Sequence, residues 1–466
     1  MKNLIFKLIL PIICNILSII LIIFIYKLDM IPNKYLYLGI FVLLIINIIN
    51  ILLSIGKKRI YKVISIILSI VILITSLFGI IYTDKINNLL SSAFNNNKIE
   101  ITGYGVIVLK NSNFKELKDL NNKKIGYQSI SDNKYIDLIN INGELIKYQN
   151  VYTLYEDLLN HKVSAIIVDK AYLDLLEDEY SDIFDNIRII YTYSEETKLE
   201  NNNIINNLDS INILISGSDA RTDTIAERSR SDVNMIMTVN PKTHTILLTS
   251  IPRDYYVQLH NRTGLKDKLT HAGIYGINMS KDTLADLFDI NIDYSIKVGF
   301  KSVEEVVDLI NGIDIYSDKT FNSYHIKGWV VNEGMNHFNG KQALAYSRER
   351  YAYTDGDIHR VQNQQQVLEA IIEKIIKDKS ILKRYDQVLE SFSNLYRTDI
   401  SEDYIKMIVK DQLTNMRDWT IERQYVTGSG AMLETYSMPG RNLWVMIPNE
   451  ESMNTAKTKL NEVYNG

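Results

Sequence analysis

Three long apolar runs near the N-terminus constrain this chain more than any other feature. They cover residues 8–26, 35–55 and 63–82, are 19, 21 and 20 residues long, and carry no charged side chain. A helix rises about 1.5 Å per residue, so each run can cross the roughly 30 Å of bilayer hydrocarbon. We predict three transmembrane helices within a membrane region at residues 1–85. A cleavable signal peptide is the alternative for the first run, but no Ala-x-Ala-like cleavage site follows it.

The basic residues around these runs predict their orientation. Lys2 and Lys7 precede the first run, and four basic side chains lie in the loop 56–62. The loop 27–34 carries only two lysines and one aspartate. Because short cytoplasmic loops are enriched in Lys and Arg, we expect a multi-pass cell-membrane protein with its N-terminus inside and everything after about residue 84 outside the cytoplasm.

Charge is distributed unevenly between this region and the rest of the chain. Residues 1–85 have a balance of +7, whereas the remaining 381 residues carry 42 basic and 53 acidic side chains. Nucleic acid is therefore not an expected partner, because polyphosphate binding needs a basic face. The single cysteine, Cys14, excludes an intramolecular disulfide and any Cys-rich metal site.

The part outside the membrane divides into two predicted domains. In residues 86–200 short apolar runs alternate with helical patterns, one of them at 113–120, which predicts a small α/β accessory domain. This region resembles one lobe of a bacterial solute-binding protein, and a plain spacer or docking module is the alternative. The Asn-rich stretch 195–209 has no periodicity and is predicted to be the linker.

The second domain, at residues 205–466, is also predicted to be α/β. Strands are expected at 211–217, 232–240 and 244–252, and Asn-Pro-Lys-Thr at 240–243 is a turn signal that predicts a hairpin between the last two. Helices are expected near 281–289, 301–311 and 358–377. The apolar stripes of the last two helices fit either an ordinary core or the wall of an apolar groove.

Arginine and acidic side chains gather where the predicted strands end. Ligands of α/β sheets bind at such ends, arginine suits bidentate phosphate contacts, and carboxylates can reach an anion through a hard divalent cation. The alternatives are a solvated charge run at 348–350, helix or turn caps for the aspartates, and a surface pair on one helix face. The side chains in question are Asp219, Arg221, Arg228, Arg230, Asp232, Arg253, Asp254, Arg348, Glu349, Arg350, Asp357, Arg360 and Gln364.

The order and spacing of several motifs resemble a known family. The segments GSDAR, RSRSDVNMIMTVNPKTHTILLTSIPRDYYV, VDLINGIDI, GKQALAYSRER and DGDIHRVQNQQQVLEAI, within residues 210–378, are similar to the LytR-CpsA-Psr family of membrane-anchored cell-wall enzymes. The resemblance implies an α/β sandwich with an apolar tunnel for a polyisoprenyl phosphate or pyrophosphate. It also implies Mg²⁺ as cofactor and transfer of a glycopolymer from this lipid to peptidoglycan.

The resemblance also assigns residues. Asp219 and Asp232 match the magnesium-associated carboxylates of the family. Asp357 matches the aspartate that precedes the helix expected near 358–377. Lys268 matches a lysine of the family, but the position two residues later, which is usually Asn in the family, is Thr270 here. Asn363 stands where the family often has a second arginine. Residues that match the pyrophosphate-binding side chains are Arg230, Arg253, Arg348, Arg350, Arg360 and Gln364.

These observations predict a magnesium-dependent phosphotransferase. Its substrates would be a polyisoprenyl-pyrophosphate-linked glycopolymer, such as teichoic acid or capsular polysaccharide, and peptidoglycan. Arg253, Asp232 and Asp219 are the expected catalytic residues, and Asp232 is a candidate general base only if a metal does not occupy both of its oxygens. The alternatives are a pyrophosphatase that hydrolyses the lipid carrier and a sensor that binds the lipid phosphate or the polymer.

Overall fold

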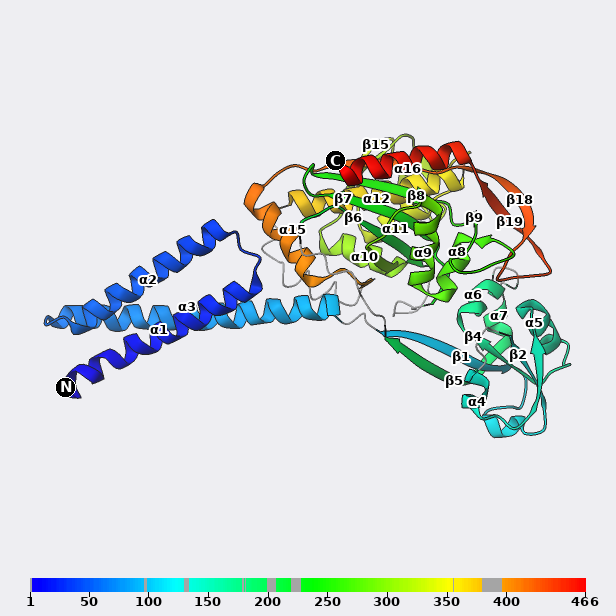
Figure 1. Cartoon of the computed structure of the whole chain (residues 1–466), viewed down its shortest axis with the longest axis horizontal. Coiled ribbons are helices and arrows are strands. Elements are labelled where there is room, and N and C mark those ends of the chain that lie inside the picture. The colour runs from blue at the N-terminus through cyan, green and yellow to red at the C-terminus, as the bar shows by residue number, and fades with distance from the viewer. Residues whose placement is uncertain are drawn as a thin grey trace.

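The computed structural model shows three parts, an N-terminal helical hairpin bundle and two α/β domains (Figure 1). The structure describes residues 2–95, 99–129, 134–177, 180, 182–198, 207–218, 228–354, 356–378 and 396–466. The two domains are the accessory domain, residues 99–198, and the main domain, residues 207–466.

The N-terminal bundle consists of α1 (Lys2–Leu28), α2 (Asn33–Ile55) and α3 (Arg59–Asn95). All three are long and apolar enough to cross a membrane, which confirms the number of predicted spans. Buried polar groups join them: the Asn50 side chain contacts the hydroxyls of Ser65 and Ser69. Such contacts hold helices together where lipid provides no hydrophobic drive for association. The third helix continues beyond the predicted end of its apolar run at residue 82, as far as Asn95. We call residues 83–95 of this helix the α3 stem.

A five-stranded sheet forms the accessory domain, in the order β3-β2-β4-β1-β5. Strands β2, β3 and β4 are parallel, and β1 is antiparallel to β4 and β5. The elements are β1 (Ile99–Leu109), η1 (Leu117–Leu120), β2 (Lys124–Gln128), α4 (Lys134–Ile139), β3 (Glu144–Tyr148), α5 (Val151–Leu159), β4 (Ala165–Asp169), α6 (Ala171–Glu177), α7 (Ile183–Asn186) and β5 (Ile187–Lys198).

Two local predictions for this domain were wrong. The helix expected at 113–120 is a single 3₁₀ turn, because the Asp119 carboxylate accepts hydrogen bonds from the backbone N–H groups of Lys115 and Glu116 and closes the chain there. The linker expected to begin at residue 195 begins later, since β5 continues to Lys198 in register with β1. Antiparallel pairing satisfies the backbone of this polar segment although its side chains at 194–196 are exposed.

The orientation of the bundle can be tested with one cysteine. Cys14 is buried, so a variant with Asn111→Cys, in the exposed turn after β1, has one accessible thiol. We expect an impermeant maleimide to label it on intact cells whose wall has been opened, because the loop charges predict that this domain lies outside. A Lys58→Cys variant is the control and should react only after lysis. The reverse pattern would contradict the predicted topology.

A six-stranded sheet is the centre of the main domain, in the order β16-β11-β6-β7-β8-β17. As predicted, β7 and β8 form an antiparallel hairpin, and the Asn240 side chain accepts from Lys242 N and Thr243 N in its turn. The strands are β6 (Ile211–Ser218), β7 (Val233–Asn240), β8 (Thr245–Ile251), β11 (Tyr294–Gly299), β16 (Tyr396–Thr398) and β17 (Thr420–Tyr425).

Helices cover both faces of this sheet. On one face α8 (Leu269–Ala272), α9 (Ile277–Phe288) and α16 (Glu450–Asn465) enclose a core that includes Leu214, Ile236 and Phe288. On the other, α12 (Asp357–Lys377) and α15 (Glu402–Asn415) enclose a core that includes Ile213, Met235 and Leu248. This confirms the α/β class and the helices expected near 281–289 and 358–377.

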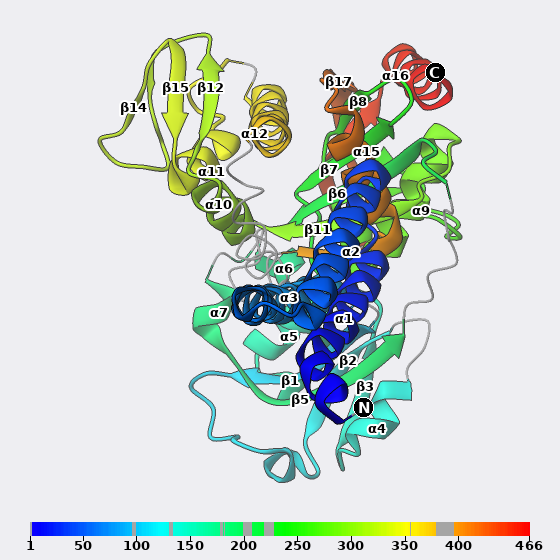
Figure 2. The same cartoon turned by 90° about the vertical axis from the view of Figure 1, so that its left-hand side faces the viewer.

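A smaller lobe packs against α12 on the side away from the sheet (Figure 2). Its helices are α10 (Phe300–Leu309), at the expected position, and α11 (Gly340–Arg348). The shorter strands and turns of the domain are β9 (Tyr256–Val257), β10 (Asp267–Lys268), η2 (Gly273–Tyr275), β12 (Ile313–Ser317), β13 (Phe321–Asn322), β14 (Val330–Val331), β15 (Gly334–Phe338), β18 (Gly428–Glu434) and β19 (Asn442–Pro448).

The N-terminal bundle contacts the main domain through α15. Val409 of α15 packs against a cluster that contains Leu28, Ile86 and Leu90, and Lys410 Nζ lies 2.6 Å from the Asp29 carboxylate. The first loop of the bundle and the stem of α3 therefore both meet the main domain.

Candidate active site

One pocket of the main domain, with a volume of about 310 Å³, collects most of the predicted site residues. Arg230 and Asp232 come from the segment before β7 and Arg253 from the turn after β8. The others come from the start of α10, the loop after β13, the end of α11 with the loop that follows it, and α12. The lining residues are Arg230, Asp232, Arg253, Phe300, Tyr324, His325, Arg348, Arg350, Tyr351, Arg360 and Gln364. Among the residues that the structure describes, this arginine pocket brings five guanidinium groups together with one carboxylate, so it favours an anion of high charge.

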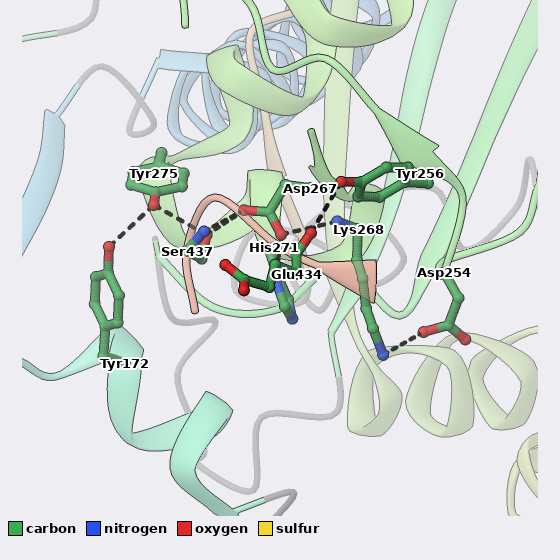
Figure 3. Close-up of polar contacts among 9 residues, drawn as sticks. All are labelled: Tyr172, Asp254, Tyr256, Asp267, Lys268, His271, Tyr275, Glu434 and Ser437. Carbon is green, nitrogen blue, oxygen red and sulfur yellow. Dashed lines mark hydrogen bonds and ion pairs between the residues drawn. The ribbon is translucent and has the colours of Figure 1, made fainter. Parts of the chain in front are cut away.

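Alternating charges run from the pocket into the protein. Arg253 donates from Nη1 to Asp232 Oδ1 at 2.7 Å, and its Nε lies 3.6 Å from Asp254 Oδ2. Lys268 Nζ lies 3.0 Å from the other oxygen of Asp254 (Figure 3). Lys268 therefore does not line the pocket, where the sequence placed it as a substrate-binding residue, and it reaches Arg253 through Asp254.

The backbone around Arg230 is held on both sides. Ser229 and Ser231 are buried, and their hydroxyls pair with those of Ser218 and Ser216 of β6 at 2.8 Å each. Ser231 N donates to Thr270 O at 3.0 Å, and Thr270 N donates to Arg253 O at 2.8 Å. Thr270 thus joins the two pocket segments through its backbone, a role that does not depend on which side chain the position carries.

Gly273 offers a test of how closely this arrangement must be kept. It has an ordinary helical φ of −64°, but an added Cβ would collide with the carbonyl oxygen of Ser229. We expect Gly273→Ala to lower turnover about fivefold to tenfold, because the backbone beside Arg230 must move and small displacements of a group predicted to position the substrate are costly. Turnover measured together with the melting temperature checks this, and Gly264→Ala, in open space but at positive φ, is a control for destabilisation alone.

The segment 348–350 is not a solvated charge run. Glu349 is 1% exposed, and its carboxylate accepts hydrogen bonds from four backbone N–H groups, those of Tyr324, Arg350, Tyr351 and Ala352. It thereby folds the loop that follows α11. The Arg348 guanidinium lies over the Phe300 ring, and Arg350 donates to the hydroxyl of Tyr351. The buried carboxylate thus orders the loop that carries Arg350 and Tyr351 to the pocket.

Helix α12 presents Arg360 and Gln364 to the pocket from positions one turn apart. Asn363, between them, is fully buried and donates to Tyr346 O of α11 at 3.2 Å. The position therefore serves helix packing here. Asp357 is the first residue of α12, but its side chain is not among those described, and Asp219 and Arg221 also lie outside the described residues.

The described residues provide one carboxylate that fits a magnesium ion. Asp232 Oδ1 is bonded to Arg253, whereas Oδ2 has no hydrogen-bond partner among the described residues and belongs to a side chain that lines the pocket. No group of three or more His, Cys, Asp or Glu side chains with metal-binding geometry occurs in the described part of the chain. Mg²⁺ commonly takes one or two protein carboxylates and completes its shell with phosphate oxygens and water, so the donor set fits that ion when a phosphate is present.

All residues of the pocket lie within the match to one known protein family. The sequence profile described as the LytR_cpsA_psr family matches residues 185–465, more than half of the chain and all of the pocket. The chain belongs to the LytR-CpsA-Psr family. It is 30% identical over 259 residues to an Enterococcus faecalis protein named polyisoprenyl-teichoic acid–peptidoglycan teichoic acid transferase TagU, which covers 55% of this chain and 83% of that protein.

Two further relatives come from Bacillus subtilis. Its protein named TagU is 35% identical over 222 residues, which is 47% of this chain and 66% of that protein. The crystal structure of its TagV is similar with a TM-score of 0.47 and 27% identity, over 56% of this chain and 98% of that one. The family profile begins near the end of the accessory domain, so most of that domain and the three membrane helices lie outside it.

The sequence missed several residues that complete the LytR-CpsA-Psr pocket here. Phe300, Tyr324, His325 and Tyr351 line it beside the arginines. His325 Nε2 lies 3.1 Å from Arg348 O, which ties the loop after β13 to the end of α11. Tyr324 and His325 carry no spacing signal, because they belong to a loop. Glu349, which was predicted together with Arg348 and Arg350, does not line the pocket and instead folds the loop that carries Arg350.

Proposed function

We propose that this member of the LytR-CpsA-Psr family transfers a glycopolymer from a polyisoprenyl pyrophosphate to peptidoglycan outside the cytoplasm. The observation that carries the proposal is the convergence of five arginines and one aspartate on a single pocket in a domain joined to three apolar helices. The names of its relatives, teichoic acid transferases that act on peptidoglycan, support the same reaction class.

The reaction is a substitution at phosphorus. A hydroxyl of a peptidoglycan sugar attacks the phosphorus bonded to the polymer, a new P–O bond forms, and the bond to the second phosphate breaks. The polymer phosphate stays on peptidoglycan, the hydroxyl proton goes to a base, and the polyisoprenyl phosphate leaves. Such a transfer depends on positioning and charge neutralisation, which the arginine pocket provides.

Arg253 and Asp232 would have distinct parts in this step. Two neighbouring carboxylates hold the Arg253 guanidinium, so its orientation is fixed before the donor binds. Asp232 keeps one oxygen toward Arg253, and the other would hold Mg²⁺. When bound, Mg²⁺ would neutralise charge on the pyrophosphate oxygens. Asp219, which the family resemblance pairs with Asp232, would be the second carboxylate.

The lipid tail needs an apolar path between the pocket and the membrane. Half-buried apolar side chains lie between α12, α15 and the sheet, among them Leu368 and Ile372 of α12 and Ile405 and Ile408 of α15. Because α15 also packs against the first loop of the bundle and the α3 stem, this path leads toward the membrane helices. We propose it as the route of the polyisoprenyl chain.

Transfer of a radiolabelled lipid-linked polymer to purified peptidoglycan tests the function. We expect the full chain, in detergent or liposomes and with magnesium, to attach the labelled polymer to peptidoglycan. The label should then sediment with the insoluble peptidoglycan. Release of soluble polymer without attachment would instead support the pyrophosphatase, and donor binding without any product would support the sensor.

A further inference from the structure

Two exposed tyrosines line the arginine pocket. Tyr324, in the loop after β13, is 67% exposed, and Tyr351, in the loop after α11, is 57% exposed. Their ring centroids are 4.2 Å apart and their planes are tilted by 40°. At that separation the two rings contact each other, so a ligand can reach only their outer surfaces. Two large aromatic side chains left this exposed beside a binding pocket indicate a surface for a ligand.

One buried carboxylate holds the backbone of both tyrosines. Glu349 accepts hydrogen bonds from Tyr324 N at 2.9 Å and from Tyr351 N at 3.0 Å, one with each of its oxygens. The Ser323 hydroxyl accepts from His325 N at 3.2 Å, which orders the turn around Tyr324. The aromatic pair is therefore positioned before a ligand arrives, and binding costs less conformational entropy.

Tyr324 is the more open of the two rings. The Tyr351 hydroxyl accepts from Arg350 Nη2 at 2.8 Å, so Tyr351 contacts both Arg350 and Tyr324. The His325 ring packs nearly perpendicular to that of Tyr324, with centroids 5.5 Å apart. Tyr324 keeps two thirds of its surface exposed in spite of these contacts. Part of its ring is therefore open to solvent beside the arginines.

The chemistry of this surface fits a neutral sugar. An isoprenoid chain needs an enclosed apolar channel, whereas these rings are open to water and carry hydroxyl groups. The face of an aromatic ring is electron-rich, so it repels phosphate and attracts the weakly positive C–H groups on the face of a pyranose ring. The hydroxyls of such a sugar can stay in water. The pocket thus offers arginines for the phosphates and an aromatic ring for a sugar.

We propose that Tyr324, supported by Tyr351, binds the first sugar of the donor glycopolymer, the one joined to the pyrophosphate. The inference rests on the proposed function. A single oxygen atom joins that sugar to phosphorus, so the sugar must lie at the edge of the phosphate site. Arg350 lines the pocket and bonds Tyr351, which places the tyrosine pair at such an edge. The acceptor glycan has no covalent link to the phosphates and no comparable constraint.

This contact would let the protein distinguish its donor from its product. The polyisoprenyl phosphate that leaves carries no sugar, so it cannot occupy the Tyr324 surface. A carrier that still bears the polymer keeps both the phosphate and the sugar contacts. The bare carrier therefore binds more weakly and is released.

The test compares binding of a polyprenyl pyrophosphate with and without one N-acetylglucosamine, a neutral pyranose, to the full chain in detergent. We expect the wild type to bind the sugar-bearing lipid about fivefold tighter or more, and Tyr324→Leu to lower this ratio below about twofold. Affinity for the bare lipid should stay within about twofold, because the arginines remain. Tyr324→Phe keeps the ring and should retain at least half of the preference. Tyr351→Leu, which removes the support, should also lower it.

Tyr316→Leu is the matched control. Tyr316 lies on β12 of the same lobe, is 59% exposed and does not line the pocket, so its replacement should leave the ratio unchanged. Melting temperatures of all variants check that the lobe stays folded.

Three results would overturn the inference. One is a wild type that binds both lipids equally. The second is an equal loss of both lipids in Tyr324→Leu, which would make the tyrosine a support for the loop. The third is an unchanged ratio with a raised KM for peptidoglycan, which would assign Tyr324 to the acceptor. If the wild type binds neither lipid, it is the proposed function that fails.

Discussion

Replacing Arg253 with lysine is expected to reduce transfer turnover at least tenfold while the domain stays folded. In the structure this guanidinium bonds Asp232 through Nη1 and approaches Asp254 through Nε, so two of its nitrogen atoms orient it. Lysine has one nitrogen, which cannot meet both carboxylates and also contact a phosphate in bidentate fashion. A tenfold loss corresponds to about 1.4 kcal/mol of transition-state stabilisation.

Arg350→Lys is expected to behave similarly, because Arg350 lines the same pocket and its position follows from the loop that Glu349 folds. Steady-state transfer of labelled polymer, with melting temperatures, measures both effects. Arg417→Lys is the matched control, since Arg417 is exposed and far from the pocket along the chain. Near-normal activity in both pocket variants would remove these arginines from the site.

Asp232→Ala is expected to have the largest effect, a loss of turnover of about a hundredfold or more, with donor binding changed far less. The substitution removes both the partner that orients Arg253 and the oxygen proposed for Mg²⁺. The apolar contacts of the lipid tail remain, so most of the binding energy is retained. Asp219→Ala should follow the same pattern if the two carboxylates share one ion.

A magnesium titration on these variants separates the metal site from a capping role. A lost cap would mainly lower stability, by about 0.5–2 kcal/mol, and leave the magnesium dependence of turnover unchanged. A metal ligand would shift the concentration of magnesium needed for half-maximal activity. Full turnover with the wild-type magnesium dependence would rule out Asp232 as a ligand.

Local patterns in the sequence were sufficient for much of the fold. The three membrane helices follow from apolar length alone, and the β7–β8 hairpin follows from a turn signal between two apolar strands. The extent of β5 was harder to predict, since Glu195 and Glu196 look like linker residues until β1 is paired beside them. Strand pairing depends on residues that are distant in the sequence, so the local pattern of a polar segment does not predict it.

The site residues, too, could be predicted only where the sequence has a local motif. Its arginines were predictable because they lie in dense motifs, and the structure places six of the seven predicted substrate-binding or catalytic cationic and amide groups, all except Lys268, around one pocket. Lys268 supports the site from behind Asp254, which only the three-dimensional arrangement reveals.

The length of α3 has a consequence for where in the wall such an enzyme can work. Its 37 residues amount to about 55 Å of helix, of which the bilayer core takes about 30 Å. The main domain rests on the emerging stem and on the loop between the first two helices, so its height above the lipid surface is limited. If the domain acts on peptidoglycan as proposed, only glycan strands that lie close to the membrane surface can receive polymer from it.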